Sequence, residues 1–324
     1  MQIFNAKTIL LTGGTGSFGQ KFSEILLQEH NPKSLRIYSR GELMQYEMEK
    51  AFHDDRLRFF IGDVRDRSRL IRAMNGVDIV VHAAALKQVP ACEYNPIEAI
   101  KTNIDGTVNL IDAAIDSGVE RVLLISTDKA VHPVNLYGAT KMVAEKMVIQ
   151  GNTYVGGKNK TRFSCVRYGN VIGSRGSVIP LFKEQRKTGT ITITDERMTR
   201  FWLSLDQGIH FVMECLERMQ GGEIFVPKIP SMKLVELAKS VAPEARIQNI
   251  GIRPGEKLHE TLITEDESRH SLEYDTFFVI EPEYASWQKV VLPGGRPLPE
   301  NFRYTSDMNT SWLTKADLSK MIEV

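Results

Sequence analysis

A glycine-rich run at residues 13–19 constrains the fold of this chain more than any other feature of its sequence. An apolar segment comes directly before this run, and a helical pattern follows it. Gly13 permits a tight turn, Gly16 lets the backbone approach a pyrophosphate, and Gly19 lets the helix pack closely on the strand. A glycine-rich turn can also occur without a ligand. A strand before it and a helix after it nevertheless predict a dinucleotide-binding unit.

Short apolar runs recur along the first half of the chain and alternate with stretches of helical periodicity. These runs are residues 7–12, 35–38, 57–61, 78–85, 122–125 and 163–168, and long helices are predicted over residues 17–29, 96–117 and 137–149. Strands that alternate with helices form parallel sheets, with helices on both faces. The sequence therefore predicts an α/β fold with a doubly wound parallel sheet, the Rossmann arrangement.

The residues after the second predicted strand bear on the choice of cofactor. Folds of this kind that bind NAD carry an acidic residue about 20 positions after the glycines, against the ribose 2′-hydroxyl. This chain has Ser39 and Arg40 at that place. Because arginine suits a 2′-phosphate, the sequence predicts NADP. Glu42 lies close enough to keep NAD as an alternative, and Arg40 could also be an ordinary surface charge.

The next two predicted strands end in further candidates for the cofactor site. The third strand ends at Asp63 and Val64. Asp63 could accept a hydrogen bond from an adenine amine, cap the following helix, or do both. The fourth strand ends in small residues that include Ala83, and Lys87 follows just beyond it. Small side chains would let a cofactor lie against the backbone, although they could equally reflect tight core packing.

A polar stretch, STDKAVHPVNLYGATK at residues 126–141, follows the fifth predicted strand. Tyr137 and Lys141 are four positions apart in it, so on a helix they share one face. That spacing would let the Lys141 ammonium lower the pKa of the Tyr137 phenol. The carboxyl ends of parallel strands are where open α/β sheets bind ligands. The stretch is therefore a candidate catalytic site, with a buried tyrosine beside a surface lysine as the alternative.

Beyond residue 173 the elements become short and are punctuated by proline. We expect residues 1–173 to form the NADP-binding domain, with residues 199–227 returning to it, and residues 174–324 to form a smaller, mixed substrate-binding cap. Arg175, Arg200 and Arg253 lie in turn segments of this cap. They could clamp a diphosphate or could simply be surface arginines.

Composition excludes several classes of partner and site. The net charge of +1 gives no electrostatic reason to expect binding to nucleic acid or to an anionic membrane. Three cysteines without a close pair suggest free thiols in a reducing compartment, and the seven histidines lack metal-ligand spacing, so no metal is expected. No apolar run is long enough to cross a membrane, and a first strand that starts by Thr8 leaves no room for a signal peptide, so we expect a cytoplasmic protein.

Several motifs together resemble the extended short-chain dehydrogenases/reductases that act on nucleotide sugars. The resemblance rests on the glycine run, HAAA at 82–85, Thr127, Tyr137 and Lys141. A narrower resemblance is to the inverting UDP-N-acetylglucosamine 4,6-dehydratases of the pseudaminic acid pathway. It rests on AAALKQVPACEYNP (83–96), residues 126–141, GNVIGSRGSVIP (169–180), MTRFW (198–202) and RPGEKLHE (253–260). Related deoxythymidine-diphosphoglucose dehydratases carry an Asp-Glu pair where this chain has Asp128 and Lys129, and longer relatives carry an N-terminal membrane region absent here.

The resemblance implies NADP held throughout turnover, UDP-N-acetylglucosamine as the substrate and a homo-oligomer paired through helices beside the sheet. It also implies a hydride-transfer triad of Thr127, Tyr137 and Lys141 and a dehydration pair of Asp128 and Lys129. Together with the residues above, the predicted cofactor site comprises Gly13, Thr15, Gly16, Ser17, Phe18, Gly19, Ser39, Arg40, Asp63, Val64, Ala83, Lys87, Tyr137, Lys141 and Val171. The predicted substrate site comprises Lys87, Asn170, Ser177, Val178, Arg200, Arg253 and Glu256.

This chemistry requires particular protonation states. Lys129 would remove the C-5 proton if burial and nearby positive charge lower its pKa, and Asp128, kept protonated in a dry site, would protonate the departing 6-hydroxyl. Consecutive strand residues face opposite ways, so both can reach one sugar only if the strand ends at about Thr127. A retaining dehydratase, a UDP-sugar 4-epimerase and a non-catalytic NADP-sensing protein on the same fold are the alternatives.

Overall fold

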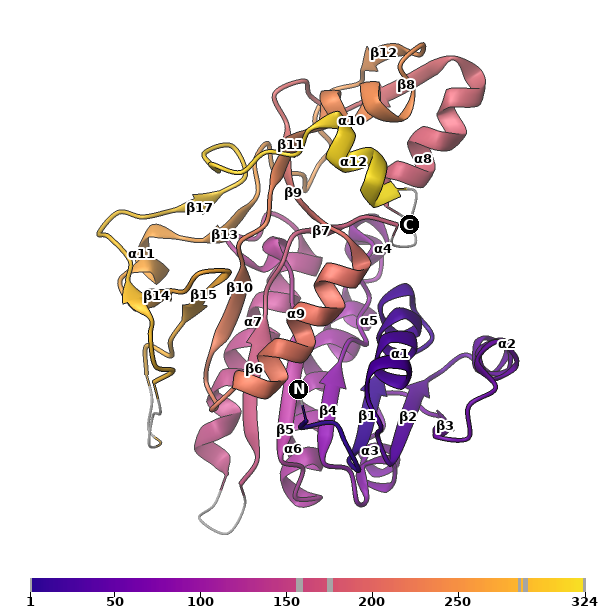
Figure 1. Ribbon diagram of the computed structural model, residues 1–324, viewed down its shortest axis with the longest axis vertical. Coiled ribbons are helices and arrows are strands. Elements are labelled where there is room, and N and C mark those ends of the chain that lie inside the picture. Colours follow the sequence, from indigo (N-terminus) through magenta and orange to yellow (C-terminus); the bar gives the residue numbers. More distant parts are fainter. Residues whose placement is uncertain (1, 156–159, 174–176, 285–286, 288–290, 323–324) are drawn as a thin grey trace.

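The computed structural model describes residues 2–155, 160–173, 177–284, 287 and 291–322, and a large twisted sheet forms its centre (Figure 1). Six parallel strands of this sheet run in the order β3-β2-β1-β4-β5-β6. They are β1 (Thr8–Thr12), β2 (Ser34–Ser39), β3 (Leu57–Ile61), β4 (Ile79–His82), β5 (Arg121–Ile125) and β6 (Arg162–Val166). The strand order reverses between β1 and β4, which is the point where such sheets bind dinucleotides. The predicted doubly wound parallel sheet is confirmed.

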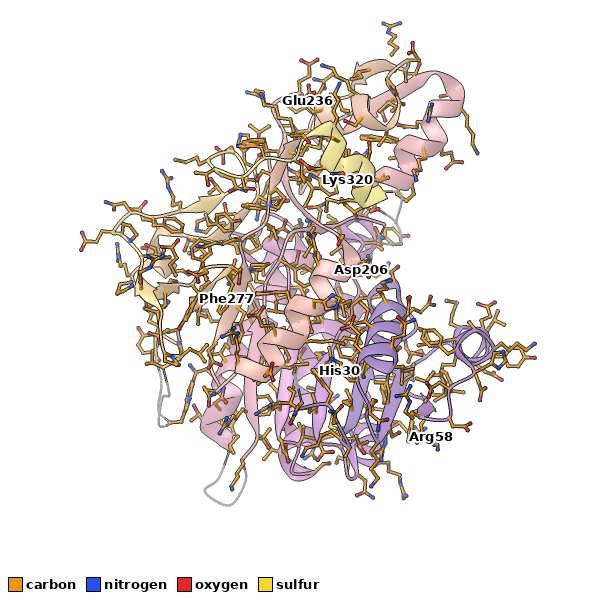
Figure 2. The ribbon with its side chains drawn as sticks, viewed as in Figure 1. His30, Arg58, Asp206, Glu236, Phe277 and Lys320 are labelled. Carbon is orange, nitrogen blue, oxygen red and sulfur yellow. The ribbon has the colours of Figure 1, made fainter. Side chains whose placement is uncertain are left out.

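Helices cover both faces of this sheet and bury its apolar strands. α1 (Ser17–Glu29) packs against α9 (Leu205–Arg218), and Lys21 pairs with Asp206 across them at 3.0 Å (Figure 2). On the other face, α6 (Gly106–Asp116) contacts both α3 (Arg67–Met74) and α7 (Leu136–Gly151). The central strands are buried along their whole length because neither of their faces meets solvent.

The predicted helix over residues 96–117 is continuous but not uniform. It consists of α5 (Pro96–Ile100), a π-helical turn at Lys101–Asp105, and α6. The Asn103 side chain in the widened turn bonds both backbone groups of Leu86, at 2.8 and 2.9 Å, and contacts Thr140 at 3.0 Å. The sequence analysis missed two other helices, α2 (Glu42–Phe52) and α4 (Val89–Tyr94), because both lack a clear apolar stripe.

A smaller lobe with its own core lies beyond the carboxyl ends of the strands (Figure 1). Its core includes Ile191, Trp202, Leu237 and Leu318. Its elements are β7 (Asn170–Val171), β9 (Thr199–Leu203) and β11 (Ser231–Lys233) in one sheet, β8 (Thr190–Ile193) and β12 (Arg246–Asn249) in another, and α8 (Val178–Gln185), α10 (Leu234–Val241) and α12 (Lys315–Ile322).

The chain returns from the small lobe to the main sheet. After α9, strand β10 (Ile224–Pro227) pairs parallel with β6. The sheet then continues with antiparallel strands β15 (Phe277–Ile280), β14 (Ser271–Glu273) and β16 (Arg296–Pro297). The sequence analysis had assigned these three strands to the cap. They join the main sheet because β15 is an apolar, fully buried run that fits beside β10, with Phe277 packed into the core (Figure 2).

Three short elements lie between this extension and the small lobe. β13 (Thr261–Ile263) pairs with β17 (Tyr304–Thr305), and α11 (Glu265–Ser268) follows β13. Just before β13 lies the segment 253–260, which contacts the turn after β5 through Lys257. This contact brings residues more than a hundred positions apart to one site.

Candidate functional site

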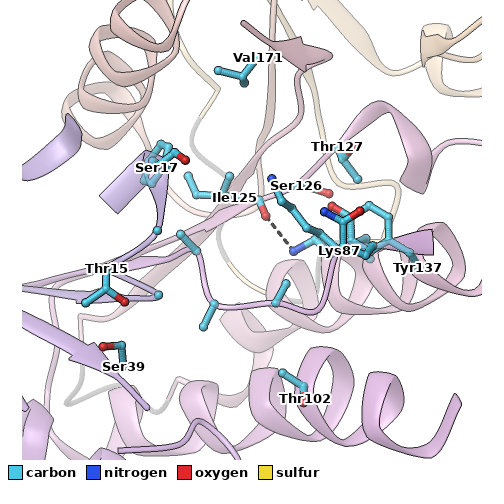
Figure 3. A pocket seen from close by; sticks show the side chains of 18 of the residues that line it. Thr15, Ser17, Ser39, Lys87, Thr102, Ile125, Ser126, Thr127, Tyr137 and Val171 are labelled. Carbon is cyan, nitrogen blue, oxygen red and sulfur yellow. Dashed lines mark hydrogen bonds between the residues drawn. The ribbon is translucent and has the colours of Figure 1, made fainter. Parts of the chain in front are cut away.

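A cavity of about 950 Å³ opens at the carboxyl ends of the parallel strands, between the main sheet and the small lobe. Among the predicted site residues, those that line it are Gly13, Thr15, Gly16, Ser17, Phe18, Ser39, Arg40, Asp63, Val64, Ala83, Lys87, Thr127, Lys129, Tyr137, Lys141, Asn170, Val171, Ser177 and Glu256. The structure therefore brings both predicted sites together along one continuous wall (Figure 3).

The glycine-rich loop forms one end of the cavity. Gly13 has φ +69°, and a Cβ there would lie 2.9 Å from the backbone of Ala84, so the turn and the end of β4 need a residue without a side chain. Gly19 does not line the cavity, and a Cβ there would collide with the Gly14 backbone. This is the close helix packing expected of that position. The amino end of α1 lies at the cavity, where residues 16–18 are part of the lining, and no side chain among the described residues caps it. A helix amino end of this kind suits a pyrophosphate.

The ends of β2 and β3 form the far part of this pocket. Arg40 is exposed, and its guanidinium lies 3.8 Å from the Asp63 carboxylate. Although burial opposes ionisation, hydrogen bonds from Arg65 lower the pKa of Asp63. The cap of α3 is Asp66, which accepts from the Arg69 N–H. Capping by Asp63, one of two expected roles, is therefore wrong because the helix begins later.

Tyr137 and Lys141 lie on the first turns of α7, whose amino end is capped by Asn135. Burial raises the pKa of Tyr137 to about 12, although the charge of Lys129 and the contact with Thr127 act to lower it. Burial lowers the pKa of Lys141 to about 8, and its ammonium donates to the Ile125 carbonyl at 2.8 Å (Figure 3). The ammonium that favours the phenolate is thus that of Lys129, rather than Lys141 as expected, since Lys141 is turned towards the end of β5.

The predicted dehydration pair, Asp128 and Lys129, lies on a tight turn rather than on a strand. β5 ends at Ile125, and residues Asp128–Ala130 form a 3₁₀ turn that begins at Thr127. The Asp128 carboxyl, which is fully buried, accepts from the Lys129 ammonium at 3.0 Å and from the Thr127 hydroxyl at 2.9 Å. Leaving the strand early lets two consecutive side chains meet, as the chemistry requires. Asp128 itself does not line the cavity.

The turn and the start of α7 are pressed against each other. A Cβ at Gly138 would collide with the carbonyl oxygen of Lys129 and would lie 3.1 Å from the Pro133 side chain. Glycine at this position therefore lets the helix that carries Tyr137 touch the turn that carries Lys129.

Behind Lys129 lies a buried cluster of charges that we call the Lys129 network: Asp128, Lys129, Arg200, Lys257 and Glu260. One oxygen of Glu260 is 3.6 Å from both the Lys129 ammonium and the Arg200 guanidinium, and its other oxygen is 3.4 Å from the Lys257 ammonium. The Lys257 ammonium also donates to the carbonyls of Asp128 and Val131.

Arg200 was expected to bind substrate, but it does not line the cavity. It is buried and donates to the backbone carbonyls of Thr199, Leu258 and Lys257, at 2.7 to 3.1 Å. The guanidinium thus holds the segment after residue 253 in place beside Glu260. Arg200 is therefore an internal brace rather than a cavity residue.

The two carboxyl groups of the Lys129 network have opposite pKa shifts. Burial raises the pKa of Asp128, and Glu260 raises it further. Burial also opposes ionisation of Glu260, but Lys129, Arg200 and Lys257 outweigh it and lower the pKa of this group. Because their pKa values are shifted in opposite directions, Asp128 is suited to act as an acid and Glu260 as a permanent anion.

Lys129 behaves differently from the expectation of a lowered pKa. Burial disfavours its ammonium, but the carboxyl groups of Asp128 and Glu260 outweigh burial and raise the pKa of Lys129. The neighbours that matter are negative, whereas the sequence suggested positive ones. Lys129 can therefore act as a base only after passing its proton to a neighbour, and Asp128 is within hydrogen-bond distance.

The remaining predicted substrate residues fall into two groups. Asn170, Ser177 and Glu256 line the cavity, and Val178 begins α8 directly after Ser177. Arg253 is exposed and does not line the cavity; its guanidinium lies 4.0 Å from Glu256. Arg175 lies outside the described residues.

Sequence reasoning missed Lys257 and Glu260 as site residues, although both belong to the RPGEKLHE motif. It also missed Ser126, Thr102 and Tyr168, which line the cavity. Within the part of the chain that the structure describes, no group of three or more His, Cys, Asp or Glu side chains could hold a metal ion. Across the same residues, no helix combines the length and apolarity needed to cross a membrane.

Comparison with known protein sequences gives closely related chains. An inverting UDP-N-acetylglucosamine 4,6-dehydratase of Campylobacter jejuni is 49% identical over 99% of this chain and 98% of its own length. A protein of Rickettsia canadensis named UDP-glucose 4-epimerase is 39% identical, over 99% of this chain and 96% of its own length.

Solved structures show the same fold. Pen from Bacillus thuringiensis has a TM-score of 0.90 and 39% identity, covering 99% of this chain and 98% of its own. DesIV from Streptomyces venezuelae, a dTDP-glucose 4,6-dehydratase with NAD bound, has a TM-score of 0.69 and 25% identity, covering 78% of this chain and 86% of its own. Residues 9–282 match the polysaccharide biosynthesis protein family. The chain belongs to this family, within the extended short-chain dehydrogenases/reductases.

Proposed function

We propose that this chain is an inverting UDP-N-acetylglucosamine 4,6-dehydratase. It would convert UDP-N-acetylglucosamine into a UDP-2-acetamido-2,6-dideoxy-4-keto-hexose with inversion at C-5. The observation that carries the proposal is the meeting of Tyr137 and Lys141 with the Asp128–Lys129 turn at one cavity. The 49% identity to the inverting dehydratase of Campylobacter jejuni supports the choice of substrate.

The first step oxidises C-4 of the sugar. Tyr137 as the phenolate takes the 4-hydroxyl proton. With a pKa of about 12, little phenolate exists at neutral pH, so the positive charge of Lys129 matters because it increases that fraction. Lys141 is held by the Ile125 carbonyl at the cavity wall. When bound, the nicotinamide dinucleotide supplies the hydride acceptor and later the hydride donor.

The second step removes water. The 4-keto group acidifies the C-5 proton, and Lys129 removes it after its own proton has moved to Asp128 across the 3.0 Å contact. Asp128, whose pKa is raised by burial, would then supply the proton of the departing 6-hydroxyl. Because Asp128 does not line the cavity, we propose that this proton passes through the Thr127 hydroxyl, which contacts the Asp128 carboxyl at 2.9 Å and does line the cavity. After C-6 is reduced, protonation of C-5 on the opposite face gives the inverted sugar.

Incubation of the purified protein with UDP-N-acetylglucosamine tests the proposal. We expect the nucleotide sugar to lose the mass of one water, and proton NMR of the product formed in deuterated water to show deuterium at C-5 with inverted configuration. Retention at C-5 would identify a retaining dehydratase. The absence of turnover with any nucleotide sugar would support a non-catalytic NADP-sensing protein.

A UDP-sugar 4-epimerase is the second candidate, and the relative of that name from Rickettsia canadensis favours it. An epimerase removes and returns hydride at C-4 and needs no acid–base pair for C-5 and C-6. The Asp128–Lys129 pair therefore favours the dehydratase. In the same incubation, a product of unchanged mass with altered configuration at C-4 would identify the epimerase.

We propose NADP as the cofactor. The cavity wall fits a dinucleotide at the glycine-rich loop, and Ser39 and Arg40 line the place where a 2′-phosphate would lie. The nucleotide released by denaturing the purified protein should carry a 2′-phosphate, and Arg40→Asp should shift the preference towards NAD. Release of mainly NAD from the wild-type protein would contradict the proposal.

We also propose a cytoplasmic homo-oligomer that supplies pseudaminic acid biosynthesis. The described cysteines are free and buried, which suits a reducing compartment. An apolar hollow between α6 and α7 includes Ile111, Met142 and Met147 and is a suitable surface for pairing. A monomer by light scattering at micromolar concentration would contradict the oligomer, and unchanged cell-surface glycans after gene deletion would contradict the pathway.

A further inference from the structure

We propose that Glu260 is a positioning residue of the dehydration step: its carboxylate holds Lys129 beside Asp128 and balances the charge that Lys129 gains from C-5. This inference rests on the proposed function. It adds to that function a residue from the far side of the cavity wall, contributed by the segment between the small lobe and β13.

The geometry gives Lys129 two different sides. One side lines the cavity, and the other meets Asp128 at 3.0 Å and Glu260 at 3.6 Å. The backbone of Glu260 is held by Ser306 on both sides. The Glu260 N–H donates to the Ser306 hydroxyl at 2.9 Å, and the Glu260 carbonyl accepts from the Ser306 N–H at 2.8 Å. Glu260 as a whole residue is 2% exposed, so its carboxylate is shielded from water.

One carboxylate oxygen in each acid of this network has no hydrogen-bond partner among the described residues. These atoms are Oδ2 of Asp128 and Oε2 of Glu260, both buried. An ion pair selected only for stability would normally satisfy such acceptors. For Asp128 the open acceptor fits a group that takes up and releases a proton. For Glu260 the nearest charge is the Lys257 ammonium at 3.4 Å, so it is held by ion pairs rather than by hydrogen bonds, as expected of a carboxylate that stays ionised.

The charge balance explains why a permanent anion is needed. The groups that face Lys129 and Glu260 are Lys87, Asp128, Tyr137, Arg200 and Lys257. Three of these are cations, so a proton that arrives on Lys129 adds positive charge to a site already rich in it. The Glu260 carboxylate offsets this repulsion, and in a buried site a nearby opposite charge acts strongly.

The step itself balances within the pair. The C-5–H bond breaks and its proton goes to the Lys129 amine, while the bonding electrons form the C-5–C-6 double bond. The C-6–O bond breaks, and the hydroxyl leaves as water with the Asp128 proton. A neutral pair thereby becomes an ammonium–carboxylate pair, and Glu260 stays ionised throughout.

Glu260→Gln tests the inference, since it keeps the shape and removes the charge. Removing a negative charge lowers the pKa of both Asp128 and Lys129, so both limbs of the pH profile of C-5 deuterium exchange should move to lower pH. On the alkaline limb exchange should slow about tenfold for each pH unit by which the limb moves, and on the acid limb it should become faster. Formation of reduced nicotinamide in a single turnover should change less than C-5 exchange, because Glu260 acts on Tyr137 only through Lys129 and Asp128.

Glu267→Gln is the matched control. Glu267 is a half-buried glutamate paired with an arginine, Arg167, but it does not contact Lys129. We expect it to leave the pH profile of exchange unchanged, and Glu260→Asp, which keeps the charge, to retain the wild-type profile. An unshifted profile in Glu260→Gln, or an equal shift in Glu267→Gln, would overturn the inference.

Two further outcomes keep the test decisive. If Glu260→Gln does not fold, Lys257→Gln replaces it: loss of this cation should move the exchange profile to higher pH, and an unchanged profile would refute the role of the network. If the wild-type protein forms no dehydrated product, the proposed function fails. A wild-type protein that does form it, together with an unshifted variant, rejects only the role of Glu260.

Discussion

Two buried arginines in this molecule hold carboxylates in different ways. Arg167, on the loop after β6, donates to Glu145 at 2.7 and 3.1 Å, to Glu267 at 3.0 and 3.1 Å, and to the Leu262 carbonyl at 2.8 Å. We call these three charged residues the Arg167 network. In the Lys129 network, the Arg200 guanidinium comes no closer than 3.6 Å to Glu260. Its N–H groups donate to backbone carbonyls instead.

The difference separates charges that support the fold from charges that serve the cavity. Short, multiple hydrogen bonds tie α7, β6 and α11 together through Arg167, so that network is closed. The Lys129 network has longer contacts and unpaired acceptors, and one of its members lines the cavity. Burial of an arginine is therefore a poor guide to its role, and the completeness of its pairing is a better one.

Lys129→Ala should have the largest effect on activity, and it tests whether the Lys129 network serves the cavity. A general base contributes roughly 10²–10⁴ in rate, so dehydration should fall at least a hundredfold. The variant should still bind UDP-N-acetylglucosamine, and it should reduce the cofactor more slowly because Tyr137 loses the nearby Lys129 charge. Deuterium should fail to enter C-5. Exposed Lys239 on α10 offers a control, Lys239→Ala. A raised KM with a nearly intact kcat, or near-normal exchange, would remove Lys129 from the mechanism.

Arg167→Met should break the Arg167 network and act on stability. Removing one partner of a buried ion pair leaves uncompensated charges and costs about 3–5 kcal/mol, here on Glu145 and Glu267. Urea unfolding of the variant and the wild type measures this loss. Arg218→Met, which removes an exposed arginine paired with Glu214 on α9, should cost less than about 1 kcal/mol. Equal losses in the two variants would show that the network adds nothing.

The smallest effect concerns the acid stability that the Arg167 network contributes. Burial opposes ionisation of Glu267, but Arg167 outweighs it and lowers the pKa of Glu267 below its ordinary value of 4.5. Its contribution to stability is therefore present above that value and is lost as pH falls through the lowered pKa. The difference in unfolding free energy between wild type and Glu267→Gln should shrink in this range. A difference that grows with acid would contradict the assignment.

Much of the fold follows from local patterns in the sequence. The glycine run, the apolar strands and the spacing of Tyr137 and Lys141 each lie within a few residues, so their geometry follows from the helix or turn that contains them. The end of β5 before Thr127 was expected on the same grounds. The strands β14 to β16 were misassigned because their position depends on pairing with β10, far along the chain.

The electrostatics of the site could not be predicted in this way. The pKa of Lys129 depends on Glu260, which lies 131 positions later and reaches it only through the packing of residues 253–260. The role of Arg200 depends on the same segment. Sequence motifs identify such residues as candidates, but the sign of a pKa shift depends on which charges tertiary packing brings within a few ångströms.

The contact at Gly138 has a consequence for how such a site can diversify. Because a side chain there would strike the Lys129 carbonyl, the helix that carries Tyr137 and the turn that carries Lys129 are already in contact and cannot come closer. A substitution that moves the helix towards the turn to fit a new sugar therefore requires a second substitution that moves the turn. New specificities are therefore easier to reach by altering the small lobe, whose residues face the substrate without sharing this constraint.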